Sequence, residues 1–256
     1  MPKQAILFDV DGTLVDSNEA HVDAWCEAFA CAGFHFDRAA IHHQVGKGGD
    51  NLVPSLIPDA PKDVQDRVDQ AHGEIYKRDY LDGVRPFPGA RDLLLRTREA
   101  GKTVVLASSA SQPELDHYVR LLEAGEIIDG ATSKDDVAHS KPCPDIFEAA
   151  AKKAAVAPSD ALVIGDTPYD IVAARRSGIA AIALTSGGFR EDELRAERPV
   201  AIYADVAALL ADFANSPIAD QSSFSGAESP SLSPRSPRST CPPPKPRPSW
   251  PVCGLG

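Results

Sequence analysis

Short, uninterrupted apolar runs recur along most of the chain, and they constrain the fold more than any other feature. The runs do not alternate with polar residues, which is typical of parallel strands that are covered on both faces of a sheet. Helical patterns lie between them, as crossover connections require. The sequence therefore predicts an α/β fold with a doubly wound parallel sheet. The runs are 4–8, 103–107, 127–131, 161–164, 179–184 and 201–203, and the clearest helical patterns between them are 90–99, 113–123 and 145–155.

One connection is much longer than a single crossover helix. Between the first and second runs, from 16 to 85, the pattern is rich in helix, with helices expected at 19–32 and 62–80. We expect this insertion to form a helical cap domain, whereas 1–15 and 86–215 form the α/β core.

Beyond the core the composition changes. The segment 216–256 consists mainly of Ser, Pro, Arg and Gly. Too few large apolar side chains are present there to offset the entropy cost of ordering the chain. The sequence therefore predicts a disordered tail over these residues.

The overall charge disfavours some classes of partner. A net charge of −11 repels nucleic-acid backbones and anionic lipid headgroups, so we expect neither nucleic acid nor membrane as a partner. The five cysteines form no CxxC pair, and their odd number leaves at least one outside any disulfide within the chain. The simplest expectation is a protein of the reducing cytoplasm. The sequence does not indicate an oligomeric state.

Acidic residues directly follow the first apolar run. Asp9 and Asp11 are two positions apart, so in extended backbone their side chains leave on the same side. Two carboxylates held together repel each other unless a proton or a cation lies between them. Gly12 then allows the chain to turn sharply. An Asp-Gly turn after a strand would by itself account for this pattern.

Further polar clusters follow later apolar runs. Ser108 and Ser109 end the second run, where a lone serine is commonly only a helix cap. Lys141 comes just before a helical pattern that prolines help to start. Asp166 and Asp170 follow the fourth run, where acidic side chains also favour the N-terminus of a helix. Each cluster alone has an ordinary structural explanation.

Taken together and in this order, the clusters resemble the motifs of the haloacid dehalogenase superfamily. Its first motif is DxDGTL after hydrophobic residues, which residues 9–14 match completely. The resemblance covers about 1–213. It implies that Asp9 attacks phosphorus and that Asp11 is the general acid and base. It also implies that Ser108 binds the phosphoryl group and that Lys141 offsets negative charge on the nucleophile and the phosphoryl oxygens.

The resemblance implies Mg²⁺ as the cofactor. Asp166 is expected to be a direct ligand together with Asp9 and Asp11, while Asp170 supports the site through water or by orienting its neighbours. The implied reaction is hydrolysis of a small phosphorylated metabolite, of the sugar phosphate or phosphoglycolate type, through an aspartyl-phosphate. Because open α/β sheets bind ligands along the carboxyl edge, we expect the clusters to meet in one crevice.

Other functions stay open at this point. Dehalogenases of the superfamily lack the second aspartate of the first motif, so Asp11 favours phosphate chemistry. A sugar phosphomutase resembling β-phosphoglucomutase is an alternative, since His21 stands much where those mutases carry a histidine. Lys47, in the glycine-rich segment 45–51, and Ser109 are further candidates for substrate contact. A non-enzymatic protein that binds partners through its proline-rich tail is the alternative from another class.

Overall fold

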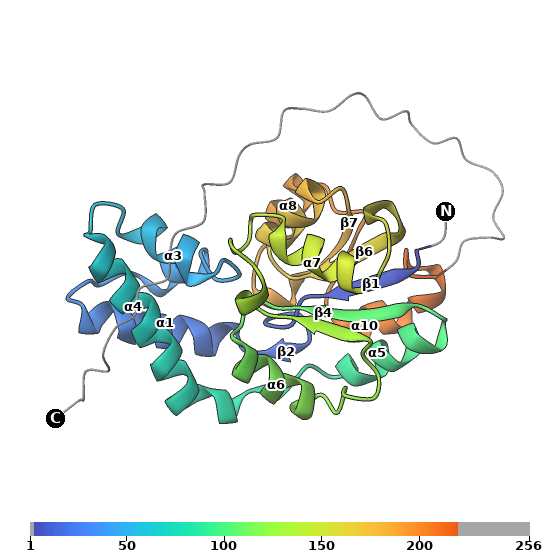
Figure 1. The fold of residues 1–256 in the computed structure, drawn as a ribbon, viewed down its shortest axis with the longest axis horizontal. Helices are drawn as coiled ribbons and strands as arrows, with labels where there is room; N and C mark the ends of the chain where they lie inside the picture. The colour runs from blue at the N-terminus through green and yellow to red at the C-terminus, as the bar shows by residue number, and fades with distance from the viewer. Residues whose placement is uncertain (1–2, 220–256) are drawn as a thin grey trace.

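The computed structural model describes residues 3–219 and contains a six-stranded parallel sheet (Figure 1). The strand order is β5-β4-β1-β6-β7-β8. The central strand β1 pairs in parallel with β4 on one side and β6 on the other, and all its side chains are buried. The predicted α/β sheet is therefore confirmed. The strands are β1 (Ala5–Phe8), β4 (Thr103–Ala107), β5 (Gly130–Thr132), β6 (Ala161–Gly165), β7 (Ala180–Leu184) and β8 (Ala201–Tyr203).

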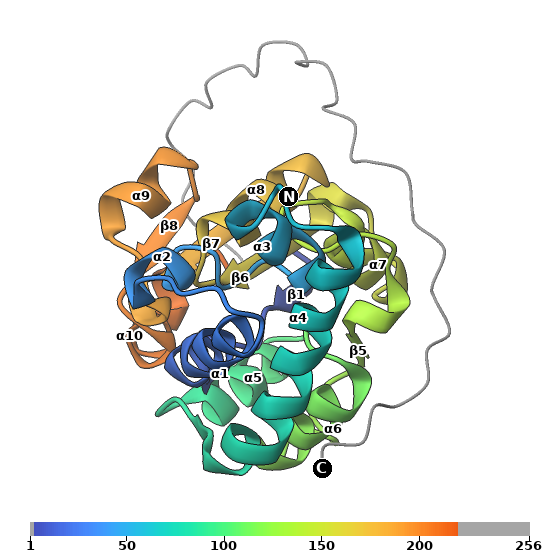
Figure 2. The ribbon, with the colours of Figure 1, turned by 90° about the vertical axis from the view of Figure 1, so that its left-hand side faces the viewer.

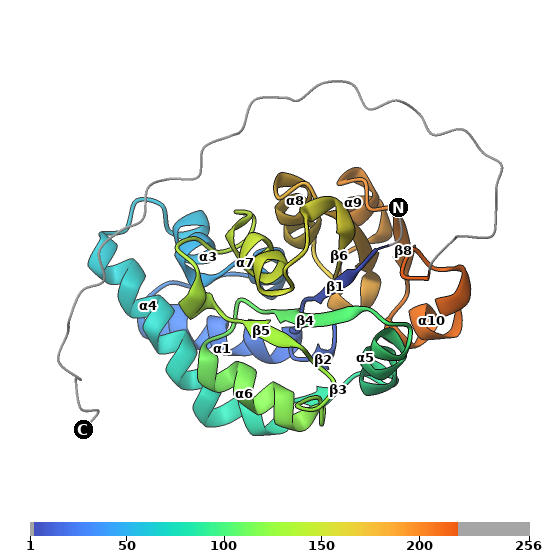
Figure 3. The same cartoon turned by 45° about the vertical axis from the view of Figure 1, so that its right-hand side comes forward.

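Helices cover both faces of this sheet (Figure 3). Ala5 and Leu7 of β1 pack into the core cluster on one face, and Ile6 and Phe8 into the cluster on the other. This split follows from the alternation of side chains along a strand. Both sides of the strand are therefore apolar, which explains the uninterrupted run. One face is covered by α7 (Asp145–Lys153), α8 (Pro168–Arg176) and α9 (Glu191–Ala196), and the other by α5 (Ala90–Glu99), α6 (Gln112–Leu121) and α10 (Val206–Ala211).

The insertion after the first strand is helical, as predicted, and lies beyond one end of the sheet (Figures 1 and 2). Its two ends are joined by a short antiparallel pair of β2 (Val15–Asp16) and β3 (Arg85–Pro86). The proposed boundaries between cap and core fall within this pair. The helices are α1 (Asn18–Cys31), α2 (Arg38–His42), α3 (Gly49–Leu56) and α4 (Lys62–Ile75), and α4 is followed by a π-helix at Tyr76–Tyr80 and a 3-10 turn at Leu81–Gly83.

Some elements differ from the sequence expectation. The short helices α2 and α3 were not predicted, because helices of this length depend on tertiary packing rather than on their own pattern. The strand expected at 127–131 lies instead at Gly130–Thr132. Ile127 belongs to the preceding turn, and it is apolar because it is buried there. The apolar run was therefore partly a packed turn.

The end of the core also lies later than expected. Ser216 and Ile218 are fully buried, so the packed chain continues past 215 and the boundary at 216 was placed too early. The rest of the predicted tail, 220–256, lies outside the described residues. Within 3–219, no helix has both the length and the apolar character that crossing a membrane requires.

Candidate active site

Three carboxylates converge at the carboxyl edge of the sheet. Asp9 follows β1 and Asp166 follows β6, and the two strand ends are held together because the Asp9 N–H donates to the Ile164 carbonyl at 2.9 Å. Asp170, in the first turn of α8, completes the group. An oxygen of each carboxylate lies within 4.8 Å of the others, and all three residues are buried. The fold thus brings the acidic residue Asp9 after the first apolar run together with Asp166 and Asp170 after the fourth.

Lys141 lies among these carboxylates. Its ammonium donates a hydrogen bond to Asp9 Oδ1 and forms an ion pair with Asp170 Oδ1 at 2.7 Å. Burial by itself would lower the pKa of Lys141, but the charges of Asp170 and Asp9 outweigh it and raise that pKa. The side chain is 2% exposed, so it is a buried cation whose charge is balanced by the acids.

The group nevertheless carries an excess of negative charge. Burial is the main reason that the pKa of Asp9 lies well above its ordinary value, and Lys141 only partly offsets it. Burial and the charge of Asp170 raise the pKa of Asp166 to about 7. One lysine therefore faces three carboxylates, and a divalent cation would relieve their repulsion. Because Mg²⁺ takes oxygen ligands and usually keeps several waters, this donor set fits it.

The Asp11 carboxylate lies outside this group of three acids, so the role of Asp11 as a metal ligand stays a prediction. Its Oδ1 accepts a hydrogen bond from Ser17 at 2.7 Å and lies 3.1 Å from His21 Nε2. Burial opposes ionisation of Asp11, but these partners, His21 above all, hold its pKa below the ordinary value. The strand ends at Phe8, so side-chain alternation does not extend to this residue. The Asp11 carboxylate instead points toward α1, a position suited to proton transfer.

The two candidate serines have different surroundings. Ser108 is fully buried, and its Oγ accepts a hydrogen bond from the Ala110 N–H at 3.0 Å. Its hydroxyl also lies 3.4 Å from Asp11 Oδ2. Ser109 is partly exposed and lines the cavity described below. Ser108 therefore lies beside the acid, whereas Ser109 faces the space that a substrate would fill.

Sequence reasoning did not assign two residues that hold Asp166 in place. Thr13 Oγ1 donates to Asp166 Oδ1 at 2.9 Å, and Asn18 Nδ2 donates to Oδ2 at 2.9 Å. Gly12 adopts a positive φ of 72°, and a Cβ there would overlap both Asp166 and Asn18. Thr13 and Gly12 belong to the motif at residues 9–14, so the sequence marked these two positions without assigning them a role. Asn18 follows that motif closely, and its burial as a polar residue is visible only in the structure.

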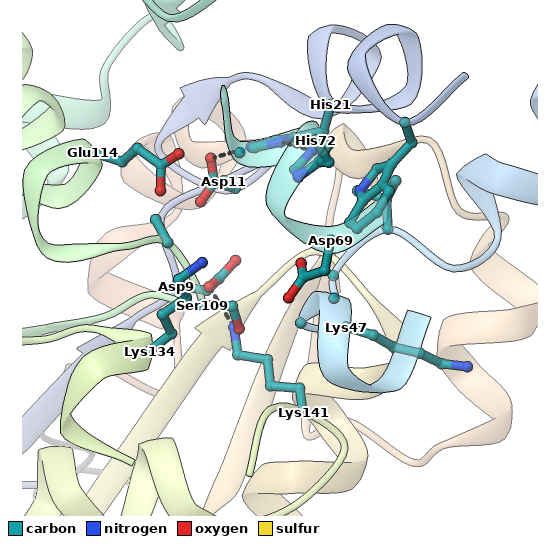
Figure 4. Close-up of a pocket in the computed structure, with 17 residues that line it drawn as sticks. Asp9, Asp11, His21, Lys47, Asp69, His72, Ser109, Glu114, Lys134 and Lys141 are labelled. Carbon is teal, nitrogen blue, oxygen red and sulfur yellow. Dashed lines mark hydrogen bonds and ion pairs between the residues drawn. The ribbon is translucent and has the colours of Figure 1, made fainter. Parts of the chain in front are cut away.

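A cavity of about 80 Å³ opens beside these groups, between the core and the inserted helices (Figure 4). Asp9, Asp11 and Lys141 form its core side. His21 lies in its wall, where its ring stacks on Tyr76 with centroids 3.8 Å apart. No motif marks several other polar lining residues. Folding of the insertion brings Asp69 and His72 of α4 to the site, whereas the core contributes Glu114 of α6 and Lys134 after β5.

Lys47 does not present its charge to the acids. Its ammonium donates to Gln44 Oε1 at 2.5 Å and to Ser55 Oγ at 3.2 Å. Figure 4 shows the nitrogen pointing away from Asp9. Lys47 lines the cavity while its ammonium is held by Gln44 and Ser55, so its contact with a substrate stays a prediction.

The glycine-rich segment packs against the loop that carries Lys141. Asn51 Nδ2 donates to the carbonyls of Ser140 at 3.0 Å and Lys141 at 3.2 Å, and Asp50 Oδ2 accepts from the Ser140 N–H at 3.2 Å. A Cβ at Gly48 would overlap the Ser140 hydroxyl. The glycine-rich segment therefore makes a close contact between the inserted helices and the core.

Comparisons with known proteins identify similar chains over most of this length. A family model described as haloacid dehalogenase-like hydrolase matches residues 3–178. Protein CbbY of Cereibacter sphaeroides is 29% identical over 229 residues, which cover 84% of this chain and 99% of CbbY. The fructose-1-phosphate phosphatase YqaB of Escherichia coli is 26% identical over 187 residues, or 69% of this chain and 94% of YqaB. The crystal structure of a hydrolase from Pseudomonas syringae is 30% identical and has a TM-score of 0.78. The match covers 83% of this chain and 99% of that hydrolase.

Proposed function

The chain belongs to the haloacid dehalogenase-like hydrolases, and we propose that it is a Mg²⁺-dependent phosphatase that hydrolyses a small phosphorylated metabolite through an aspartyl-phosphate. Similarity to phosphatases such as YqaB supports the reaction class. The observation that carries the proposal is the environment of Asp9. Its carboxylate is held by Lys141, lies beside two further acids and lines the cavity. A sugar phosphate or phosphoglycolate as substrate, and the cytoplasm as location, stay part of this proposal.

In the first step, an Asp9 carboxylate oxygen attacks phosphorus, a phosphorus–oxygen bond forms, and the bond to the leaving alkoxide breaks. Asp11 donates a proton to that alkoxide. His21 Nε2 is 3.1 Å from Asp11 Oδ1, close enough to pass a proton to it. Lys141 faces the nucleophile and lowers the charge that the phosphoryl oxygens meet.

In the second step, water attacks the phosphorus of the aspartyl-phosphate, while Asp11 removes its proton. The bond between phosphorus and the Asp9 oxygen breaks, which releases inorganic phosphate and restores the carboxylate. Asp9, Asp166 and Asp170 would hold Mg²⁺, which when bound would screen the repulsion between the nucleophile and the phosphate dianion.

A panel of phosphate monoesters tests this function. Phosphoglycolate, hexose and pentose phosphates and β-glucose 1-phosphate are incubated with Mg²⁺, with excess chelator, and with Mg²⁺ restored, and inorganic phosphate is measured. We expect phosphate release that chelation stops and Mg²⁺ restores. Ca²⁺ should support slower release, because its longer and less regular coordination misplaces the phosphate. Hydrolysis that persists in excess chelator would remove the metal from the mechanism.

A sugar phosphomutase is the second candidate, and the contact of His21 with Asp11 is the observation that favours it. A mutase must protect the aspartyl-phosphate from water until a sugar hydroxyl takes the phosphoryl group. We give β-glucose 1-phosphate with a trace of glucose 1,6-bisphosphate and compare the two products. We expect inorganic phosphate to form faster than glucose 6-phosphate if these sugars are accepted. Rapid isomerisation with little phosphate release would establish the mutase instead.

A further inference from the structure

The end of the cavity away from Asp9 has its own polar groups. Asp69 of α4 lies opposite Asp9, and its carboxylate points into the space between them (Figure 4). Lys134 and Glu114 reach the same cavity from the core. This end would hold the part of a substrate that carries no reacting phosphate.

Asp69 has unused hydrogen-bonding capacity. Among residues 3–219, its carboxylate makes no hydrogen bond or ion pair. A Cβ at Gly49 would overlap Asp69 Oδ1, so the start of α3 covers one side of the carboxylate. Burial raises the pKa of Asp69, and the charge of Lys134 only partly offsets this. A partly buried carboxylate without a partner is costly, and hydroxyl donors from a ligand would satisfy it.

The charges around Asp69 disfavour a second anion. The Lys141 ammonium is engaged by Asp9 and Asp170, and the Lys47 ammonium points away from the acids. Lys134 lines this end of the cavity and Lys62 also acts on Asp69, but the carboxylates of Asp69, Glu114 and Asp50 outnumber these two lysines. A second phosphoryl group here would meet more negative than positive charge.

An aromatic wall lies beside Asp69. The rings of Trp25 and His72 stack with centroids 3.7 Å apart and an interplanar angle of 6°. Both line the cavity. Burial is the main cause that holds the pKa of His72 well below its ordinary value, so this ring is neutral. Uncharged aromatic side chains next to a hydrogen-bond acceptor suit a molecule that carries both C–H groups and hydroxyls.

We infer that Asp69 is a specificity-determining residue that accepts hydrogen bonds from the hydroxyl groups of a polyhydroxylated phosphate monoester and rejects the corresponding bisphosphate. This inference rests on the proposed phosphatase function and narrows its substrate class. It assigns a role in recognition to α4, separate from the groups that act on phosphorus.

Two sugar esters and one aryl ester test the role of Asp69. Fructose 1-phosphate and fructose 1,6-bisphosphate differ by one phosphoryl group, and p-nitrophenyl phosphate lacks the hydroxyls. We measure kcat/KM with Mg²⁺ for the wild type, Asp69→Asn and Asp69→Ala. The matched control is Asp63→Asn, because Asp63 lies on the same helix but is exposed and paired with Arg67. Melting temperatures establish that each variant is folded.

The wild type should prefer the monophosphate by about tenfold or more, from like-charge repulsion in a partly buried site. Asp69→Asn, which keeps the shape and removes the charge, should reduce this preference. Asp69→Ala should lower kcat/KM for fructose 1-phosphate relative to p-nitrophenyl phosphate by about 10- to 100-fold, as loss of hydrogen bonds to a charged acceptor implies. Asp63→Asn should match the wild type both in the ratio of kcat/KM for the monophosphate to that for the bisphosphate and in the ratio for fructose 1-phosphate to p-nitrophenyl phosphate.

Ratios in both Asp69 variants that equal those of the control would overturn the inference, as would a wild-type preference for the bisphosphate. Absence of phosphate release from all three esters would instead reject the proposed function. In that case, calorimetric titration of Asp9→Asn with the two fructose esters still tests Asp69. The inference is supported if Asp9→Asn binds fructose 1,6-bisphosphate more weakly than fructose 1-phosphate and if adding Asp69→Asn reduces this difference. Equal or tighter binding of the bisphosphate by Asp9→Asn overturns it.

Discussion

At the scale of single residues, the candidate site depends on placing like charges together. Asp9, Asp166 and Asp170 are all buried at one strand edge, where only Lys141 compensates them within the described chain. Such an arrangement disfavours the apo state, because burial raises the pKa of Asp9 and Asp166. A divalent cation bound among the three carboxylates would relieve this repulsion. The cost of burying the acids without a cation and the gain from binding one would then have the same electrostatic origin.

Replacing Asp9 with Asn should abolish turnover and leave the fold intact. The amide has the same size but is not an anionic nucleophile, and it weakens the metal group. The loss should exceed the roughly 10²–10⁴-fold that is typical of removing a general acid or base alone. Phosphate release and the melting temperature are measured for Asp9→Asn and for Asp82→Asn, an exposed control. A folded Asp9→Asn protein with near-parental activity would refute the role of Asp9 as nucleophile.

His72 should make stability depend on pH. Burial, followed by the charges of His21, Lys134 and Lys77, holds its pKa well below the ordinary 6.5. As the pH falls below 6.5, the unfolded chain therefore binds a proton that the native state refuses. The free energy of unfolding should fall by up to about 1.4 kcal/mol per pH unit from this one group.

Urea unfolding at pH 7, 6 and 5 measures this effect. The curve for His72→Gln should be flatter than that of the wild type, whereas His35→Gln, which changes an exposed histidine, should follow the wild type. Parallel curves for His72→Gln and the wild type would show that His72 does not contribute.

At the scale of secondary-structure elements, α3 links the inserted helices to the loop that carries Lys141. Asn51 and Asp50 in its first turn bond to the backbone of Ser140 and Lys141. The segment before it needs glycine because Gly48 lies against Ser140. The position of this short helix therefore determines where the Lys141 backbone lies.

Removing the Asn51 side chain should loosen this contact. Asn51→Ala loses two partly buried hydrogen bonds, so the free energy of unfolding should fall by about 1–2 kcal/mol and kcat by about tenfold. Asn51→Asp keeps the shape but has no N–H donor, and it should show a similar loss. Ser55→Ala on the exposed side of the same helix is the control. Full activity in Asn51→Asp would mean that the donated hydrogen bonds do not position Lys141.

At the scale of the whole molecule, Mg²⁺ should stabilise the fold, because its candidate ligands come from the ends of two central strands and from α8. At 100 times its dissociation constant, a ligand adds about 2.7 kcal/mol, which for a chain of this size shifts the melting temperature by on the order of 5–10 °C. Thermal unfolding with Mg²⁺ and with chelator measures the shift. Asp166→Asn should lose most of it and Asp82→Asn should retain it. Equal melting temperatures in both conditions would argue against this metal group.

The sequence by itself determined the sheet and the order of its polar clusters. Uninterrupted runs such as 103–107 identify strands buried on both faces, and parallel strands place their carboxyl ends at one edge. The meeting of Asp9 with Asp166 follows from this local pattern and topology. The elements with weak patterns were missed: α2 and α3 are too short to be marked by periodicity.

Only the tertiary structure decided where individual side chains point. Asp11 turns to Ser17 and His21 because the strand ends before it, and Lys47 turns to Gln44 and Ser55. Asp69 shares no motif with the acids and reaches the cavity only because α4 packs beside α1. Local sequence encodes hydrogen-bonded elements and their buried faces, whereas contacts between distant elements depend on how those faces pack together.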